Sequence, residues 1–90
     1  MEKYEIVKQV KWCVADVTIH GRILKNVISG ISSNYPYSWE ISKYCSINGD
    51  IDVYIPGQQI GISVADAEQN MENYINRFEN YIIIKDNDTF

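Results

Sequence analysis

The sequence predicts an α+β fold, in which a small antiparallel β-sheet of four or five strands carries one C-terminal amphipathic helix packed on one face. Two observations lead to this prediction. Apolar and polar residues alternate in several segments before residue 63, which is typical of strands, whereas residues 63–80 place apolar side chains at helical spacing. The chain has 90 residues, enough for one modest core, so we expect residues 1–90 to form a single domain.

The first third of the chain admits two interpretations, because its apolar residues fit both a strand and a helix. The alternation typical of a strand runs through Tyr4, Ile6, Val10, Trp12 and Val14. Enrichment in Val, Ile, Thr and Trp through Ile19 favours the strand. We expect His20-Gly21 to turn the chain into a second strand over residues 22–28, and Gly30 with residues 32–38 to form a loop.

Residues 39–55 predict a β-hairpin that Pro56-Gly57 ends, because proline cannot donate to the ladder. Side chains alternate with a period of two, so the apolar faces of the two strands match only across a loop of odd length. A three-residue loop over residues 47–49, with Gly49 in the left-handed conformation, meets this condition. The register that it predicts pairs Ser46 with Asp50 and Cys45 with Ile51.

This register divides the hairpin into two faces. The side chains expected to face the core are Ile41, Cys45, Ile51, Val53 and Ile55. Those expected to face outward are Glu40, Ser42, Tyr44, Asp50, Asp52 and Tyr54. The outward face therefore presents carboxylates and tyrosines to a partner.

The strongest helical signal lies in residues 63–80. Ser63 is a good N-cap, and Asp66 stands three residues on, in the capping-box position. Asparagines in the interior of this segment are poor helix formers, so the helix must be held by packing on the sheet rather than by propensity. The residues that we expect to be buried together between helix and sheet are Ile41, Val53, Met71, Ile75 and Phe78.

The remaining segments predict little regular structure. Residues 58–62 form a short connection, and residues 81–84 are apolar and β-branched, which favours a final strand or a continuation docked in the core. Residues 86–90 are expected to be a frayed tail.

No catalytic or metal-binding pattern stands out, so we expect neither enzymatic activity nor a cofactor. His20 has no cysteine or carboxylate at ligand spacing, and Cys13 and Cys45 are expected to be unpaired thiols packed as small hydrophobes. Asp50 and Asp52 stand close together, but the other ligands of a calcium loop are absent. The charged N-terminus is unlike a signal peptide and the apolar runs are too short to span a bilayer, so we expect a cytoplasmic protein without a membrane partner.

The charge is distributed unevenly over a chain whose net charge is −4. Residues 1–45 carry a net charge of +2, whereas residues 46–90 carry −6. Glu68, Glu72 and Glu79 lie on one stripe of the predicted helix, with no basic residue four positions after Glu68 or Glu72. Two interpretations remain open: a solubilising surface, or a docking surface for a basic protein. Nucleic acid is disfavoured as a partner because its phosphates would meet carboxylates.

Tyrosines are the second signal, with seven in the chain. We expect Tyr74 and Tyr4 in the core. The tyrosines predicted to lie in the loop or on the outward hairpin face are Tyr35, Tyr37, Tyr44 and Tyr54. Tyrosine suits interfaces because it combines a large contact area with a polar tip, but cross-strand packing on a half-exposed sheet explains the same pattern.

Together these features predict a small acidic protein that acts by protein–protein binding and presents carboxylates to a basic surface, such as one that normally holds nucleic acid. At the level of analogy, its size, acidity and lack of a catalytic set are similar to those of phage-encoded inhibitors of host defence, including anti-CRISPR proteins, and of toxin-immunity proteins. The alternative is a structural homo-oligomer, a homodimer in the simplest case, that assembles through sheet edges.

Overall fold

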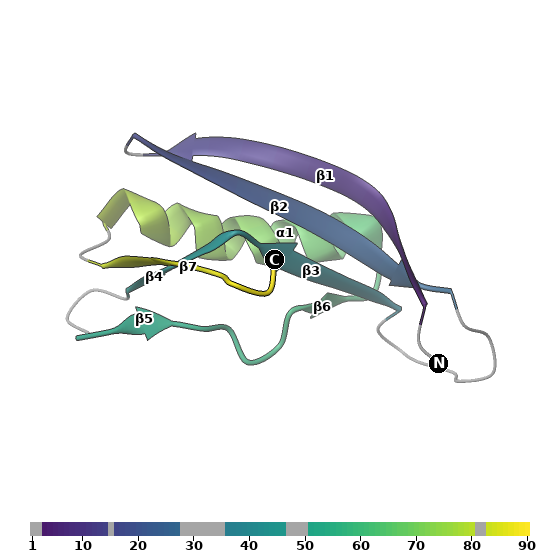
Figure 1. Cartoon of the computed structure of the whole chain (residues 1–90). Helices are drawn as coiled ribbons and strands as arrows, with labels where there is room; N and C mark the ends of the chain where they lie inside the picture. Colours follow the sequence, from purple (N-terminus) through teal and green to yellow (C-terminus); the bar gives the residue numbers. More distant parts are fainter. Residues whose placement is uncertain (1–2, 15, 28–35, 47–50, 81–82) are drawn as a thin grey trace.

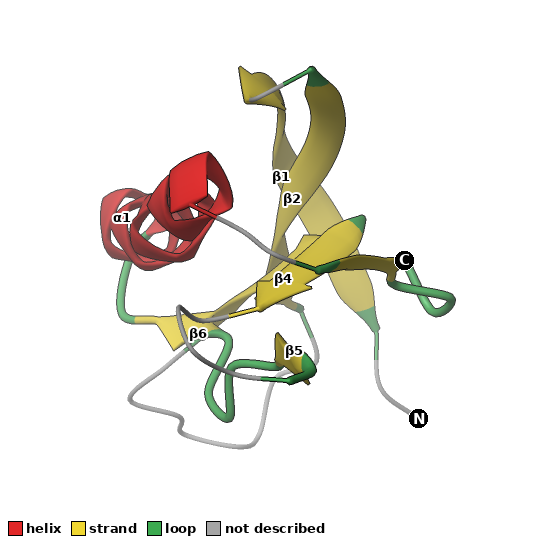
Figure 2. Ribbon diagram, turned by 90° about the vertical axis from the view of Figure 1, so that its left-hand side faces the viewer, coloured by secondary structure: helices red, strands yellow, loops and turns green. Residues whose placement is uncertain are grey.

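The computed structural model describes residues 3–14, 16–27, 36–46, 51–80 and 83–90, and it confirms the α+β arrangement (Figures 1 and 2). A four-stranded antiparallel sheet has the strand order β1-β2-β3-β6, and a three-stranded sheet has the order β5-β4-β7. The molecule is elongated, with principal extents of 43 × 23 × 22 Å. The elements are β1 (Tyr4–Val14), β2 (Val17–Asn26), β3 (Tyr37–Ile41), β4 (Lys43–Ser46), β5 (Val53–Tyr54), β6 (Ile60–Gly61), α1 (Val64–Ile75), the 3-10 helix η1 (Asn76–Asn80) and β7 (Ile84–Asp86).

The N-terminal segment is a long hairpin of β1 and β2, so the prediction of strands is confirmed. The predicted turn at His20-Gly21 is wrong, because both residues lie inside β2. The chain turns instead next to Asp16, whose φ of 66° is a left-handed conformation that Asp tolerates better than most residues. In Figure 2 this hairpin rises as a twisted ribbon away from the second sheet.

Gly21 serves close packing rather than a turn. A Cβ atom at this position would lie 2.6 Å from the Trp12 ring and 2.8 Å from the sulfur of Met71. The absence of a side chain therefore lets the Trp12 indole and helix α1 approach the middle of β2.

A β-bulge in β1 reverses which side chains face the helix. The register with β2 shifts between Ile6 and Lys8, so Ile6 pairs with Leu24 whereas Lys8 pairs with the buried Ile23. Tyr4 and Ile6, which precede the shift, therefore share a face with Leu24, opposite to the face of Ile23. The prediction that Tyr4 lies in the core is wrong for this reason, and its side chain is 46 % exposed.

The predicted central hairpin is wrong in its register. Ser46 pairs with Val53 and Cys45 pairs with Tyr54, which leaves a connection longer than three residues. Ile51 and Ile55, which were expected in the core, are 95 % and 57 % exposed. The residues of the predicted turn, 47–50, lie outside the described residues, so the left-handed Gly49 and the place of Asp50 stay predictions.

The first strand of that hairpin is also divided in two. Ser42 separates β3, which belongs to the four-stranded sheet, from β4, which belongs to the other. The main chain of Ser42 donates to the His20 carbonyl at 2.8 Å, and its hydroxyl accepts from the His20 N–H at 2.9 Å. These bonds hold the break against β2, so the chain passes from one sheet to the other at this residue.

Helix α1 begins at the predicted place. The Ser63 hydroxyl accepts from the main-chain N–H of Asp66 at 3.1 Å, and the Asp66 carboxylate accepts from the N–H of Ile62 at 3.0 Å. The helix packs on β2, β3 and β6, with Ala67 against Gly61, where a Cβ would lie 2.6 Å from the Ala67 nitrogen. Figure 1 shows the helix lying along the four-stranded sheet.

The core lies between this helix and the two sheets. Its buried members are Ile19, Ile23, Trp39, Ile41, Cys45, Ala67, Met71, Tyr74, Ile75 and Phe78. Four of the five residues predicted to be buried together are in this cluster, and the fifth, Val53, is only half-buried. None of the helices among the described residues is long and apolar enough to cross a membrane.

The C-terminal segment is tied to the sheets and differs from the frayed tail expected for residues 86–90. Asp86 ends β7 and pairs with Lys43 of β4. Asn87 donates from its main chain to the Ser42 carbonyl and from its side chain to the Ile41 carbonyl, both at 2.8 Å. The Phe90 ring lies 4.3 Å from the Arg22 guanidinium. These contacts join residues more than forty positions apart, which local sequence cannot reveal.

Candidate functional site

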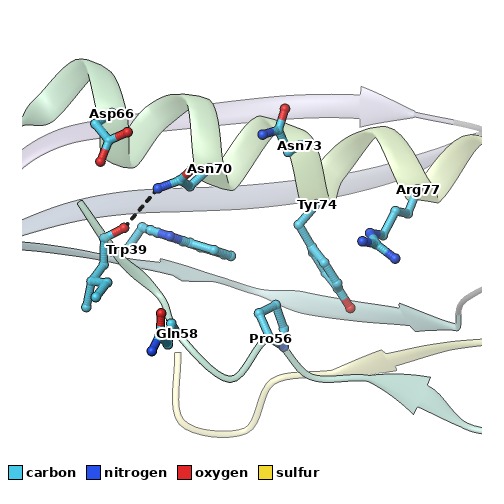
Figure 3. A pocket seen from close by; sticks show the side chains of 9 residues that line it. Trp39, Pro56, Gln58, Asp66, Asn70, Asn73, Tyr74 and Arg77 are labelled. Carbon is cyan, nitrogen blue, oxygen red and sulfur yellow. Dashed lines mark hydrogen bonds between the residues drawn. The ribbon is translucent and has the colours of Figure 1, made fainter. Parts of the chain in front are cut away.

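A groove lies between helix α1 and the chain from Pro56 to Ile60, and its cavity has a volume of about 360 Å³. This volume is in the range of small-ligand sites. Figure 3 shows the helix along one wall and Pro56 and Gln58 along the other, with Asp66 and Arg77 at opposite ends. The lining residues are Trp39, Pro56, Gln58, Ile60, Asp66, Asn70, Asn73, Tyr74 and Arg77.

Trp39 forms the back of the groove. It lies opposite Ile23 in the β2–β3 ladder, so its side chain faces the helix, and it is only 2 % exposed. The main chain of Trp39 is bonded to Gln59: its N–H donates to the Gln59 carbonyl at 3.0 Å, and its carbonyl accepts from the Gln59 side-chain amide at 3.2 Å. The indole N–H is buried and has no hydrogen-bond acceptor in the described structure. A buried donor without an acceptor is uncommon and calls for an explanation.

The side chains that form the helix wall share one face of the helix, because they are spaced four, three and four residues apart. They are Asp66, Asn70, Asn73 and Arg77. Asn70 donates its amide to the Ile60 carbonyl at 3.1 Å, which ties the helix to β6. The amide oxygen of Asn73 accepts from Gln69 at 2.9 Å, so its two N–H donors are left for solvent or a ligand.

Arg77 closes one end of the groove over two aromatic rings. Its guanidinium lies 5.2 Å from the centroid of Tyr54 and 6.0 Å from that of Tyr74. These distances suit cation–π attraction. No carboxylate within the described residues forms an ion pair with it, so its charge is available to an anion.

Tyr74 fixes the floor near this end. Its hydroxyl accepts from the main-chain N–H of Cys45 at 3.0 Å and donates toward the carbonyl oxygens of Cys45 and Tyr54. Its ring packs edge-on against Phe78 with centroids 5.9 Å apart. Burial raises the pKa of Tyr74, and burial likewise raises the pKa of the Cys45 thiol, so both groups stay neutral at physiological pH.

The second cavity has a volume of about 280 Å³ and lies where the C-terminus meets β1 and β2. Its lining residues are Gln9, Val10, Lys11, His20, Gly21, Arg22 and Phe90. The charge of Arg22 is already engaged, by Glu40 at 2.6 Å and by the Phe90 ring. This engagement makes it a weaker candidate for a ligand site than the groove.

The predicted acidic stripe is only partly unpaired. Glu68 forms an ion pair of 2.7 Å with Lys8 of β1, a partner that sequence spacing could not reveal. Glu72 is half-buried and Glu79 is exposed, and the described structure records no ion pair for either. The part of the stripe with unpaired carboxylates is therefore Glu72 and Glu79.

The hairpin residues predicted to bind a partner make separate contacts within the protein. Asp52 is paired with Lys85 at 2.7 Å, and the hydrogen bond from Lys85 lowers its pKa. Tyr54 is 41 % exposed beside the groove, whereas Tyr44 is half-buried and packs edge-on against Tyr74 with centroids 6.5 Å apart. Tyr37 lies on β3 beneath Lys25 at 6.0 Å. Tyr35 and Asp50 lie outside the described residues.

Cys45 is buried as expected, but Cys13 is exposed at the far end of β1, so the expectation that it packs in the core is wrong. Both cysteines are unpaired. Within the described residues no group of His, Cys, Asp and Glu side chains could hold a metal ion.

Sequence reasoning missed the groove. It noted the asparagines of the helix only as poor helix formers, although their spacing with Asp66 and Arg77 was a signal that they share one face. The opposite wall could not be found in this way, because Gln58 and Pro56 meet the helix only through the tertiary fold. Comparison with protein-family models, curated proteins and solved structures finds no match to this chain.

Proposed function

We propose that this protein acts by binding another protein and that the surface of α1 and η1 bearing Glu72 and Glu79 presents carboxylates to a basic partner. The observation that carries the proposal is the charge of this segment. Residues 64–80 contain four carboxylates and one arginine, and the only carboxylate of the stripe with a cationic partner in the described structure is Glu68. Charge of one sign gathered on one surface accelerates association with the opposite charge and selects against like-charged partners.

The class of partner follows from the same charge. A net charge of −4 disfavours direct binding of nucleic acid, whereas a protein with a basic, nucleic-acid-binding surface is complementary. Occupying such a surface would inhibit its owner, as expected of an inhibitor of the anti-defence or toxin-immunity type.

The test is capture of partners from a lysate of the source organism by the immobilised protein, compared with the E72K/E79K double variant. Glu68 is left in place because its reversal would also break the pair with Lys8. We expect a captured protein to be lost from the double variant and to elute as salt rises, since the Debye length shortens to about 3 Å at 1 M.

The matched control is E5K/D88K, which changes the net charge by the same amount at exposed positions on β1 and near the C-terminus. This control should retain the partner. Equal capture by the parent and E72K/E79K, or no captured protein at all, would contradict the proposal.

A second candidate is a homo-oligomer that assembles through a sheet edge, and the length of β1 favours it. In the part of the sheet that the structure describes, β1 is an edge strand of 11 residues, with Tyr4, Ile6 and Val7 exposed. The bulge next to Ile6 and the exposed Lys8 oppose this reading, because both features protect edges from pairing. Light scattering coupled to size exclusion separates the candidates: a monomer at micromolar concentration excludes a stable edge-joined dimer.

A further inference from the structure

We propose that the groove between α1 and residues 56–60 binds a short extended peptide segment whose carboxylate pairs with Arg77 and whose peptide carbonyl accepts from the indole N–H of Trp39. This inference rests on the proposed protein-binding function and names a segment that the partner would supply. The groove does not include Glu72 or Glu79, so an experiment can contradict one of the two proposals without contradicting the other.

The first support is the buried indole N–H. Trp39 is 2 % exposed, lines the groove and has no acceptor for its N–H in the described structure. Leaving a buried donor unpaired costs free energy, and an acceptor arriving from the groove would recover it. A peptide carbonyl is such an acceptor.

The N–H is shielded from water in the unbound protein, so part of the lining must move for an acceptor to reach it. Gln58 is one lining side chain that can move without breaking a hydrogen bond within the described residues. It is exposed at the rim opposite the helix and forms no hydrogen bond within the described residues (Figure 3).

The second support is the distribution of charge along the groove. Arg77 stands at one end and the Asp66 carboxylate at the other. Arg77 stands eleven positions after Asp66, and at about 1.5 Å per residue of helix this separation corresponds to about 16 Å, which an extended segment of about five residues spans. The two ends of the groove therefore fix the direction in which the peptide binds. Its carboxylate lies at Arg77, and a hydrogen-bond donor of the peptide lies at Asp66.

The third support is the chemistry between the ends. Gln58, Asn70 and Asn73 are amides, which both donate and accept, as the peptide backbone does. The Asn73 oxygen and one Asn70 donor are occupied within the protein, which leaves the Asn73 amide protons for ligand carbonyls. A purely apolar ligand would leave these groups unpaired.

The test follows the two tryptophan indole N–H signals in a ¹H–¹⁵N correlation spectrum of the intact protein, assigned with W39F and W12F. The probe is N-acetyl-triglycine, which carries peptide carbonyls and a free carboxylate, and the matched probes are its C-terminal amide and acetate. We expect N-acetyl-triglycine to shift the Trp39 signal saturably and not the Trp12 signal. The amidated probe should bind about tenfold more weakly, because it lacks the charge-assisted bond to Arg77.

The R77Q variant should bind N-acetyl-triglycine about tenfold more weakly and the amidated probe as the parent does. E79Q, a charge change on η1 outside the groove lining, should bind both probes like the parent. The proposal is overturned if N-acetyl-triglycine leaves the Trp39 signal in place, or if R77Q binds it as tightly as the parent does. Acetate that binds as tightly as the peptide would reduce the groove to a simple anion site and overturn the peptide assignment.

Discussion

The hydroxyl of Tyr74 and the main chain of Cys45 join helix α1 to strand β4. The hydroxyl accepts from the Cys45 N–H at 3.0 Å and lies 3.2 Å from the Cys45 carbonyl oxygen, and it also contacts the Tyr54 carbonyl on β5. One side chain therefore bonds two strands of the second sheet from a helix that packs mainly on the first. This link holds the closed end of the groove, where Arg77 lies over the Tyr74 ring.

Replacing Tyr74 with Phe should lower the free energy of unfolding by about 1–3 kcal/mol, because it leaves buried main-chain groups of Cys45 unpaired. Urea denaturation measures this change. Tyr37→Phe is the matched control, because the Tyr37 hydroxyl forms no hydrogen bond within the described residues. This substitution should change the free energy of unfolding by less than about 0.5 kcal/mol. Equal effects of the two substitutions would show that the Tyr74 hydroxyl does not join the sheets.

Because the pKa of the Tyr74 hydroxyl is raised, we expect the protein to lose stability in alkali. Burial raises the pKa of Tyr74 above its ordinary value of 10.0, so above pH 10 the unfolded chain gives up a proton that the folded protein keeps. The unfolded state then binds fewer protons, and the free energy of unfolding falls by up to about 1.4 kcal/mol per pH unit from this group. Tyr74→Phe should therefore have a shallower slope above pH 10 than the parent. Parallel slopes would contradict the prediction.

Phe78→Ala should lower the free energy of unfolding by about 3–5 kcal/mol, because Phe78 is fully buried and its truncation leaves a cavity beneath the Tyr74 ring. Phe90→Ala is the comparison, since Phe90 is 37 % exposed and its recorded ring contact is to Arg22. That change should cost about 1 kcal/mol or less. The melting temperatures of the two variants measure these losses, and we expect the larger decrease for Phe78→Ala. A Phe78→Ala protein that melts at the same temperature as the parent would show that Phe78 does not pack beneath the Tyr74 ring in this way.

Gly21→Ala should destabilise the protein by about 1–3 kcal/mol, because the new methyl group would overlap the Trp12 ring and Met71. Gly57→Ala makes the same chemical change where nothing lies within 4 Å, so it should be neutral or slightly stabilising. Chemical denaturation of the pair separates steric overlap from the general effect of replacing glycine.

Neutralising two neighbouring carboxylates of the helix should give opposite results. Glu68→Gln breaks the pair with Lys8 and should cost up to about 1 kcal/mol, as expected for a partly exposed ion pair. Glu72→Gln removes a like charge four residues from Glu68 and should leave stability unchanged or raise it by a few tenths of a kcal/mol. A cycle that adds Lys8→Met should abolish the effect of Glu68→Gln but not that of Glu72→Gln.

Local pattern determined the helix most fully. Ser63 caps it through the Asp66 N–H as predicted, and Met71, Ile75 and Phe78 are buried as their spacing indicated. A helix has a fixed repeat and its cap is a contact between near neighbours, so both can be inferred without knowing the rest of the fold. The strand character of the N-terminal third was determined in the same way, by residue type.

The tertiary structure decided the registers, the turn positions and the groove. A one-residue bulge next to Ile6 turned Tyr4 outward, and the break at Ser42 sent β3 and β4 into different sheets. Gly21, expected to turn the chain, instead makes room for a ring and a helix that approach from elsewhere. Glu68 has no basic partner at helical spacing, but it forms an ion pair with Lys8, which lies on a strand 60 residues earlier in the chain. Each of these outcomes depends on contacts between residues far apart in sequence, whereas periodicity reports only which side chains of one segment share a face.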